Sequence, residues 1–307
     1  MWRVIIALIP ALAWALYYFG LSALLVVLVA ILGCVATEYC INRWMFRADA
    51  TIANGSAILT GLLLGLNLPS NLDWWIVLIG AVVAIGIGKM AFGGLGCNIF
   101  NPALVGRVFL LLSFPAQMTT WPYPNAVDAA TGATATMGAD GLTGATVLGQ
   151  LKQALIEPEK IDMLQTALGS MGGSLGEVSA IALLIGFVYL LWRKVISWHI
   201  PVSIIVTAFV FAFLLGGCNL TLACVEILSG GLLLGAIFMA TDYVSSPMSH
   251  RGMLLYGFCI GLITILIRFY GAYPEGMSFA ILLMNGFTPL INRYIKPVKF
   301  GEKGVKK

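Results

Sequence analysis

The stretch Leu21-Ser-Ala-Leu-Leu-Val-Val-Leu-Val-Ala-Ile-Leu-Gly-Cys-Val-Ala-Thr-Glu-Tyr39 decides the fold class. It is long enough for one helix to cross the hydrocarbon core of a bilayer, which takes about 20 apolar residues. Similar stretches recur along the chain: 60% of its 307 residues are hydrophobic, 10% are charged, and the mean hydropathy is +0.97. This composition excludes a water-soluble domain and predicts an all-α integral membrane protein. A net charge of only +4 also argues against a nucleic-acid-binding surface.

The sequence can be cut into about ten apolar segments, most of them close to the length of one membrane span. Two of them, 56–68 and 102–114, are short for a full span. We therefore expect broken or half helices there, lining an internal site. The ten expected segments are 4–19, 21–39, 56–68, 74–88, 102–114, 178–192, 200–215, 222–240, 253–269 and 277–291.

These segments divide the chain into two membrane halves. Residues 1–114 and 178–292 each hold five expected helices, residues 115–177 form a polar loop between them, and residues 293–307 form a basic tail. Most Lys and Arg residues flank the segments on one side. The positive-inside rule then places both termini in the cytoplasm and the polar loop outside it. Because each half has an odd number of helices, the two halves would be inverted relative to one another.

A short repeat supports a relation between the halves. Thr60-Gly-Leu-Leu-Leu-Gly65 reappears as Gly230-Gly-Leu-Leu-Leu-Gly235, and each copy precedes an irregular polar segment. Lys89 corresponds loosely to Arg268, since each lies ahead of glycine. Membrane helices rich in Gly and Leu also resemble one another through composition alone. The repeat is thus a hypothesis, which places paired broken helices near the membrane midplane, where they suit a buried ligand or an ion path.

The polar loop contains two copies of the pattern D-x-x-T-G-A-T. The first copy runs from Asp128 to Thr134, and the second consists of Asp140, Gly141, Leu142, Thr143, Gly144, Ala145 and Thr146. Each ends in a threonine hydroxyl beside small residues, where a large planar group can approach the backbone. Neither threonine has a nearby His or Lys in the sequence to deprotonate it. We therefore interpret the hydroxyl as an accessible acceptor that another enzyme modifies, rather than as a nucleophile.

This pattern resembles the flavinylation signal D-x-x-[ST]-G-A-T, through which a periplasmic flavin transferase joins FMN to threonine by a phosphodiester. The rest of the chain, to Asn292, resembles the RnfD/NqrB family. The stretches that carry this resemblance are 93–110, 172–179, 198–203, 240–247, 268–276 and 283–285. Together they are highly specific, whereas a G-A-T alone would not be.

The resemblance implies a flavoprotein of the bacterial cytoplasmic (inner) membrane with covalent FMN and a second, noncovalent flavin (riboflavin or FMN). Such a protein passes electrons within a complex that moves Na⁺ or H⁺. RnfD is the closer match, because the chain lacks the long N-terminal extension of NqrB. The implied partners are the flavoprotein RnfG, the membrane pair RnfA and RnfE, the cytoplasmic subunits RnfB and RnfC that meet ferredoxin and NAD, and the flavin transferase. No strand-preceded G-x-G-x-x-G is present, so NAD is expected to bind another subunit.

Of the two threonines, we favour Thr146 as the covalent FMN site. The family pattern continues with an apolar pair and a downstream lysine, which Val147, Leu148 and Lys152 provide. Thr134 lacks this continuation and stays as the alternative or a second site.

Ser174, Glu177 and Asp242 are further candidates for contact with flavin. Ser174 and Glu177 lie in a Gly-rich stretch ahead of the sixth segment, where backbone amides and a carboxylate could meet flavin or its phosphate. Their spacing is equally that of a capping box. Asp242 closes the eighth segment, a position that suits a cation or a flavin and that helix termination also explains.

Asn101 and Arg107 are the last cofactor-binding candidates. Asn101 opens the fifth segment, and Arg107 lies one or two turns inside it. Because a charged group within the membrane is costly unless paired, we expect a partner for Arg107, such as an anionic flavin or Glu38.

Two other functions fit the same sequence. One is an NqrB-type subunit of a Na⁺-translocating NADH:quinone oxidoreductase, with similar flavins and a different electron acceptor. The other is a flavin-free secondary transporter, which inverted broken helices would also suit. We expect no catalytic residue and no metal site, since the six cysteines form no C-x-x-C or C-x-C pair.

Overall fold

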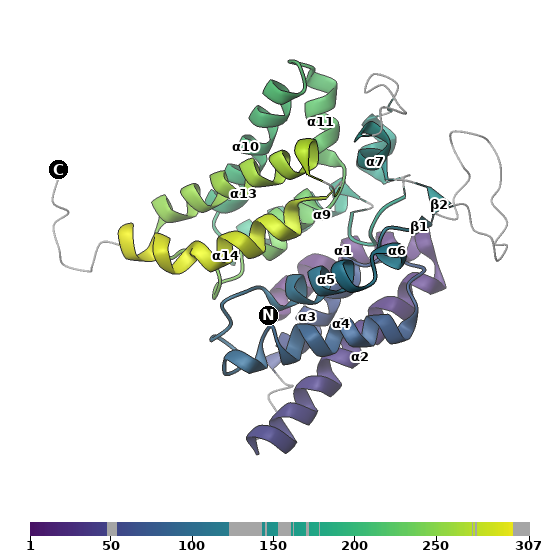
Figure 1. The fold of residues 1–307 in the computed structure, drawn as a ribbon, viewed down its shortest axis with the longest axis vertical. Coiled ribbons are helices and arrows are strands. Elements are labelled where there is room, and N and C mark those ends of the chain that lie inside the picture. The colour runs from purple at the N-terminus through teal and green to yellow at the C-terminus, as the bar shows by residue number, and fades with distance from the viewer. Residues whose placement is uncertain are drawn as a thin grey trace.

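The computed structural model describes residues 1–47, 54–122, 143–144, 146–152, 161, 163–169, 172–177, 179–271, 273 and 275–296. Within these residues the protein is helical, apart from two short strands (Figure 1). The strands β1 (Trp121–Pro122) and β2 (Thr143–Gly144) pair antiparallel, with Trp121 opposite Gly144. The all-helical fold class expected from composition is therefore confirmed for the described residues.

The first half contains a helix at each expected segment. These are α1 (Trp2–Phe19), α2 (Leu21–Cys40), α3 (Ser56–Leu66), α4 (Trp74–Gly86) and α5 (Pro102–Ser113), with the short turns η1 (Ile41–Phe46) after α2 and η3 (Met90–Phe92) after α4. Asn101 starts α5, because its side-chain oxygen accepts the N–H of Ala103 at 3.1 Å. Pro102 follows at the first helical position, where a missing N–H is tolerated.

The second half also contains helices at all its expected segments. They are α9 (Ala180–Trp192), α10 (His199–Leu215), α11 (Leu220–Leu228), α12 (Leu232–Leu234), η5 (Gly235–Met239), α13 (His250–Tyr270) and α14 (Met277–Tyr294). The expected segment 222–240 is not one straight helix, since Leu220–Leu228 and Leu232–Met239 meet at 61°. The break lies at Gly230, whose φ of +73° suits glycine. Segments 56–68 and 102–114, where we expected broken or half helices, form the short continuous helices α3 and α5.

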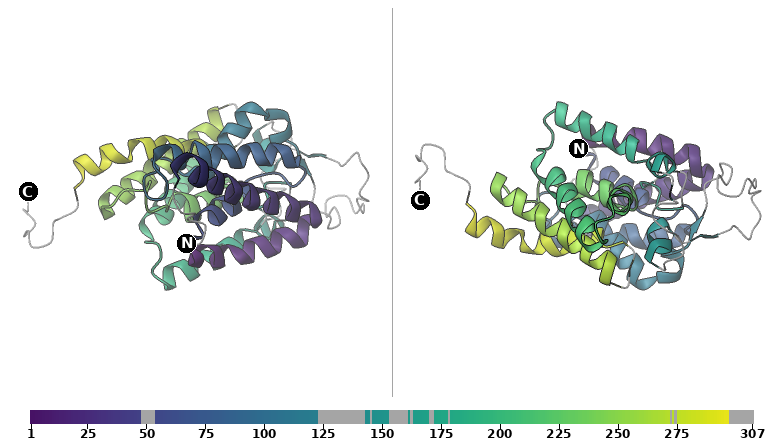
Figure 2. Two further views of the ribbon diagram at one scale, coloured as in Figure 1. Left: turned by 90° about the horizontal axis from the view of Figure 1, so that it is seen from below. Right: turned by 90° about the horizontal axis from the view of Figure 1, so that it is seen from above.

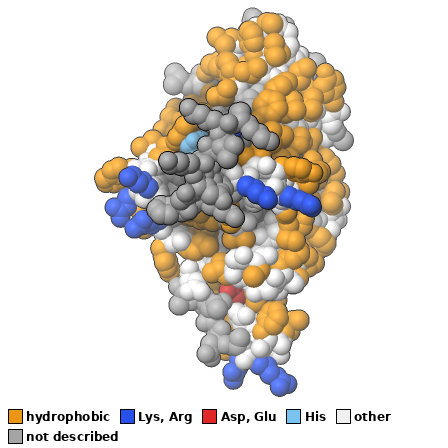
Figure 3. All heavy atoms as spheres, turned by 90° about the vertical axis from the view of Figure 1, so that its left-hand side faces the viewer, with side chains coloured by type: hydrophobic (Ala, Val, Ile, Leu, Met, Phe, Trp, Pro, Cys, Tyr) orange, Lys and Arg blue, Asp and Glu red, His pale blue; other side chains and the backbone are white. Residues whose placement is uncertain are grey.

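Within the described residues, four helices are long and apolar enough to cross a membrane: Trp2–Phe19, Leu21–Phe46, Trp74–Phe92 and His250–Tyr270. The bent pair would be a fifth, and α3, α5, α9 and α10 are shorter apolar helices. Large hydrophobic side chains such as Tyr17, Leu21 and Val188 are exposed. Figure 3 shows hydrophobic side chains over much of one face, as contact with lipid requires. Ten crossings and inverted repeats stay predictions.

The two halves pack against each other along their length. α1 to α5 form the lower part of Figure 1, and α10, α13 and α14 form the upper part. α9 crosses to pack on α1, and α14 contacts α5 (Figure 2). Within the halves, α4 packs on α2 and α5, as α13 packs on α10 and α14.

The described parts of the loop between the halves lie together at one end of the helices. They are α6 (Pro115–Met118), β1, β2, α7 (Val147–Lys152) and α8 (Met163–Leu168). In Figure 1, α6, α7 and both strands lie at the right, whereas α14 ends at the left. The loop and the C-terminal end of α14 are thus at opposite ends of the bundle.

Candidate functional site

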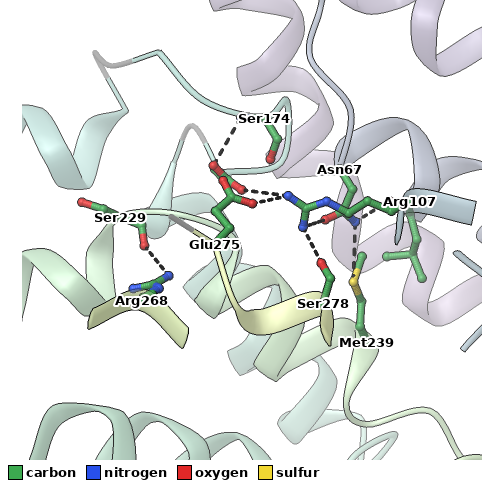
Figure 4. Close-up of polar contacts among 10 residues, drawn as sticks. Asn67, Arg107, Ser174, Ser229, Met239, Arg268, Glu275 and Ser278 are labelled. Carbon is green, nitrogen blue, oxygen red and sulfur yellow. Dashed lines mark hydrogen bonds and ion pairs between the residues drawn. The ribbon is translucent and has the colours of Figure 1, made fainter. Parts of the chain in front are cut away.

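Arg107 of α5 lies at the centre of a buried polar cluster between the halves (Figure 4). Its guanidinium donates to Asn67 Oδ1 at 3.1 Å and to Ser278 Oγ at 2.7 Å, and it forms an ion pair with Glu275. Glu177 Oε1 lies 3.9 Å from the same guanidinium. The second half and the loop before it therefore supply the acids that compensate this charge.

The expected pairing of Arg107 with Glu38 is wrong. Lys89 Nζ donates instead to Glu38 Oε2 at 2.6 Å and to Ser56 Oγ at 2.7 Å, and all three side chains are buried. These residues come from α2, from the link after α4, and from the start of α3, all within the first half. Glu38 thus has a cation inside its own half, and Arg107 takes its acids from across the contact between the halves.

A third buried ion pair closes the second half. Arg268, near the end of α13, donates to Glu226 Oε2 at 2.8 Å, to the backbone oxygen of Glu226, and to the backbone oxygen of Ser229 at 3.3 Å. All three residues are buried. Arg268 and Lys89, which the repeat aligns loosely, thus each bind a buried glutamate.

The break between α11 and α12 allows these charged groups to approach the backbone. A Cβ at Gly230 would lie 2.8 Å from Arg268 Nη2, and one at Gly231 would lie 3.1 Å from Glu177 Oε1. Any larger residue would displace a charged side chain. The two glycines of the repeated motif are therefore needed for the polar cluster as well as for the bend.

Thr146 and Glu177 line one small cavity of about 30 Å³, together with Ser229 and Gly230. The hydroxyl of Thr146 is not accessible as expected: the residue is 7% exposed, and Oγ1 accepts the N–H of Gly149 at 3.1 Å, at the start of α7. The accessible acceptor that the sequence predicts is therefore, in this structure, a buried helix cap.

Several buried polar atoms around this cavity have no hydrogen-bond partner. Within the described residues they include Ser174 Oγ, Glu177 Oε1, Ser229 Oγ, Arg268 Nε and Glu275 Oε1. Leaving such an atom unpaired costs about 1–3 kcal/mol. Five of them in one region mark a place where a ligand or a proton would complete the hydrogen bonding.

Ser174 does not cap the sixth segment. α9 begins at Ala180, and its cap is Ser179, whose hydroxyl accepts the N–H of Ala182 at 3.2 Å. The Ser174 N–H donates to Glu177 Oε2 at 3.3 Å, which is one half of the capping-box contact without the helix. Helix capping thus does not account for Glu177.

A second, larger cavity of about 190 Å³ opens between the halves. Asn98, Asn101, Asp242 and Lys89 line it, with apolar walls that include Phe238. Asp242 Oδ2 accepts hydrogen bonds from Ser245 at 3.2 Å and from Asn98 at 3.4 Å. Burial raises the pKa of Asp242, although these hydrogen bonds partly oppose the shift. Asn101 Nδ2 donates to the Met239 oxygen at 3.1 Å.

The predicted site residues thus fall into two groups. Thr146, Glu177, Ser174 and Arg107 gather around the small cavity, and Asn101 and Asp242 line the large one. Thr143 and Gly144 lie in β2, while Thr134, Asp140 and Ala145 lie outside the described residues.

The sequence analysis missed the two acids Glu226 and Glu275. Glu226 lies inside an apolar segment, which by itself marks a residue for attention. Glu275 lies in the link before α14 and carries no such signal. Only the fold brings it to Arg107.

Comparison with known proteins identifies relatives over the whole chain. The model described as "NQR2, RnfD, RnfE family" matches residues 1–301. The subunit lettered D of the Na(+)-translocating ferredoxin:NAD(+) oxidoreductase complex of Acetobacterium woodii is 46% identical, over 100% of this chain and 92% of the relative. The subunit of the same letter in the proton-translocating ferredoxin:NAD(+) oxidoreductase complex of Clostridium ljungdahlii is 41% identical, over 99% and 91%. Its counterpart in an ion-translocating oxidoreductase complex of Stutzerimonas stutzeri is 41% identical, over 98% and 91%.

Proposed function

The chain belongs to the NQR2, RnfD, RnfE family, and we propose that it is the flavin-carrying RnfD subunit of an ion-translocating oxidoreductase complex. Its similarity to subunits of ferredoxin:NAD(+) oxidoreductases favours these electron carriers over the NADH and quinone of an NqrB-type complex. Two relatives of similar identity carry names with different ions, so the proposal covers Na⁺ or H⁺ transport.

FMN is attached to Thr146 through a phosphodiester. The observation that supports this best is that the Thr146 hydroxyl lines a cavity whose wall, Ser229 and Gly230, lies against the Arg268 guanidinium. A phosphodiester carries a negative charge, and the unpaired Ser229 Oγ and Arg268 Nε are hydrogen-bond donors for its oxygens. A cavity of about 30 Å³ has room for such oxygens, not for a flavin ring, so the ring lies outside it.

The large cavity holds the second, noncovalent flavin. Its apolar walls and few convergent polar groups are typical of cofactor pockets. Lys89, Asn98 and Asp242 would orient polar groups of the ligand, while Asn101 keeps the start of α5 in place. A bound flavin supplies one-electron and two-electron chemistry.

The residues of this chain would hold and orient these carriers. A covalent tether keeps its group near the next carrier and prevents exchange with bulk solution. Arg107, paired with Glu275, fixes the two halves relative to one another and so fixes the separation of the two cavities. Moving one charge against about 100 mV requires about 2.3 kcal/mol, the energy of one electron falling through the same potential.

The remaining subunits and the location follow from the same proposal. The expected partners are RnfG, the pair RnfA and RnfE, RnfB and RnfC, and a periplasmic flavin transferase. The chain lies in the bacterial inner membrane with both termini in the cytoplasm. The opposite placement of the loop and the end of α14 supports this orientation (Figure 1). A reporter fused near Asp128 should be active only outside the cytoplasm and one after Lys307 only inside; reversed signals would refute it.

The test of flavin attachment is fluorescence of the denatured protein after maturation with the transferase. Thr146→Val removes the acceptor oxygen and one helix cap, a loss of about 1 kcal/mol, so the protein should still fold but lose the covalent fluorescence. Thr134→Val is the matched control and should keep the label. Mass mapping of the labelled peptide identifies the acceptor directly. A label that survives the double substitution, or a wild-type protein without flavin, would refute the proposal and favour a flavin-free transporter.

A further inference from the structure

The buried cluster between the halves carries more acids than bases. Its described members are the carboxylates of Glu177, Glu226 and Glu275 and the guanidiniums of Arg107 and Arg268. Arg268 is paired with Glu226, so Glu177 and Glu275 face the single charge of Arg107. An uncompensated buried charge is strongly unfavourable. The cluster therefore needs one additional positive charge.

The nearby lysine does not supply this charge. Lys152 of α7 is exposed, and its Nζ donates to the backbone oxygens of Gly271 and Tyr273. The other polar neighbours of Arg107, Asn67 and Ser278, are neutral.

The two acids lie close to one another with free oxygens. Glu177 is 5% exposed at its side chain; Oε2 accepts the N–H of Ser174, and Oε1 has no hydrogen-bond partner. Oε1 of Glu275 also lacks a partner, while Oε2 faces Arg107 (Figure 4). Two carboxylates around one guanidinium, each with an unpaired oxygen, are the arrangement in which one proton is shared.

We propose that Glu177 and Glu275 form an acid pair that holds one exchangeable proton between the two halves of the protein. Glu177 carries the proton, and Glu275 stays ionised against Arg107. Glu177 also lines the Thr146 cavity, which gives the proton a path for exchange. Protonation adds H⁺ to one carboxylate and leaves the pair with Arg107 electrically neutral.

The titration expected for each acid agrees with this assignment. Burial, and then the neighbouring charge of Glu275, raises the pKa of Glu177 to about 8. Burial also acts on Glu275, but the charges of Arg107 and Arg268 outweigh it and bring the pKa of Glu275 below its usual value. Glu177 is therefore the protonated member near neutral pH.

The proton does not depend on flavin, so its test is separate from the test of the proposed function. The C=O stretch of protonated carboxyl groups is followed by infrared spectroscopy in the full chain carrying Thr146→Val, from about pH 5 to about pH 10. One carboxyl should lose its proton near pH 8. Adding Glu177→Gln, whose neutral amide resembles the protonated acid, should remove this band and leave the protein folded.

Glu38→Gln is the matched control. Glu38 is a buried acid with its own cation, Lys89, and its substitution should leave the titration near pH 8 unchanged. Glu275→Gln is the second variant: it leaves Glu177 as the only acid beside Arg107, so the titration of Glu177 should move to lower pH. A band that persists in Glu177→Gln, a titration unmoved by Glu275→Gln, or a wild-type band that responds to Na⁺ concentration instead of pH would overturn the proposal.

Discussion

Gly230→Ala tests whether the broken helix positions Arg268. Gly230 has a φ of +73°, and a Cβ there would lie 2.7 Å from Leu148 Cδ1 and 2.8 Å from Arg268 Nη2. A matched control exists at Gly217, which has a φ of +70° and nothing within 4 Å of the added Cβ. The two substitutions therefore share the backbone strain and differ in the contact with Arg268.

The expected magnitudes follow from these contacts. An L-residue in the left-handed region costs about 1–2 kcal/mol, and this is the whole cost at Gly217. At Gly230 the Arg268 guanidinium must also move away from Ser229 and Glu226, and hydrogen bonds to a charged group contribute about 1.5–3 kcal/mol. Gly230→Ala should therefore destabilise the protein by about 2.5–5 kcal/mol, against about 1–2 kcal/mol for the control.

Thermal unfolding of both variants in detergent, compared with wild type, measures this difference. Gly230→Ala should lower the Tm more than Gly217→Ala, and an added Arg268→Met should remove most of the excess, because the displaced charge is then absent. Equal shifts for the two glycine variants would show that the bend and the ion pair are independent, which contradicts the account given of the glycine pair.

Three further outcomes are expected. Lys89→Met leaves Glu38 buried and unpaired and should cost about 3–5 kcal/mol in unfolding free energy, much of which Glu38→Gln in the same chain should restore. Because burial raises the pKa of Asp242, its stabilising contribution is complete below its unfolded pKa and is lost as pH rises through the folded pKa; the Tm of Asp242→Asn minus that of wild type should therefore increase with pH. Tyr256→Phe should cost about 1–3 kcal/mol in thermal unfolding, because the buried Tyr256 hydroxyl and the Asn285 amide hydrogen-bond at 2.5 Å, and an equal Tm would contradict this.

The helices could be predicted from the sequence because hydropathy is a local property. Each expected apolar segment contains a helix, and the start of α5 at Asn101-Pro102 follows from capping alone. The bend at Gly230 is different. Gly-Gly inside an apolar run also occurs in straight membrane helices, so only its neighbours show why the chain turns there.

The candidate site was predictable in its parts but not in its connections. A buried arginine requires an acid, and the sequence correctly indicates one for Arg107. It does not say which, since Glu275 is 168 residues away and approaches only after the halves pack. The burial of Thr146 was equally out of reach, because a motif reports the chemistry of a hydroxyl and not the helix that it caps.

The polar contacts between the halves bear on how this protein can move. Arg107 binds Glu275 and Ser278, Asn101 binds the Met239 oxygen, and the backbone of 175–176 donates to Leu68 and Leu66. Alternating access by rocking one repeat against the other would break this whole set at once. With an ion pair worth about 3–5 kcal/mol and each hydrogen bond about 1 kcal/mol, such a swing is far costlier than a rotamer change or a proton transfer within a fixed frame. Ion movement coupled to this chain is therefore expected to proceed through small local rearrangements, with the two halves acting as one rigid support.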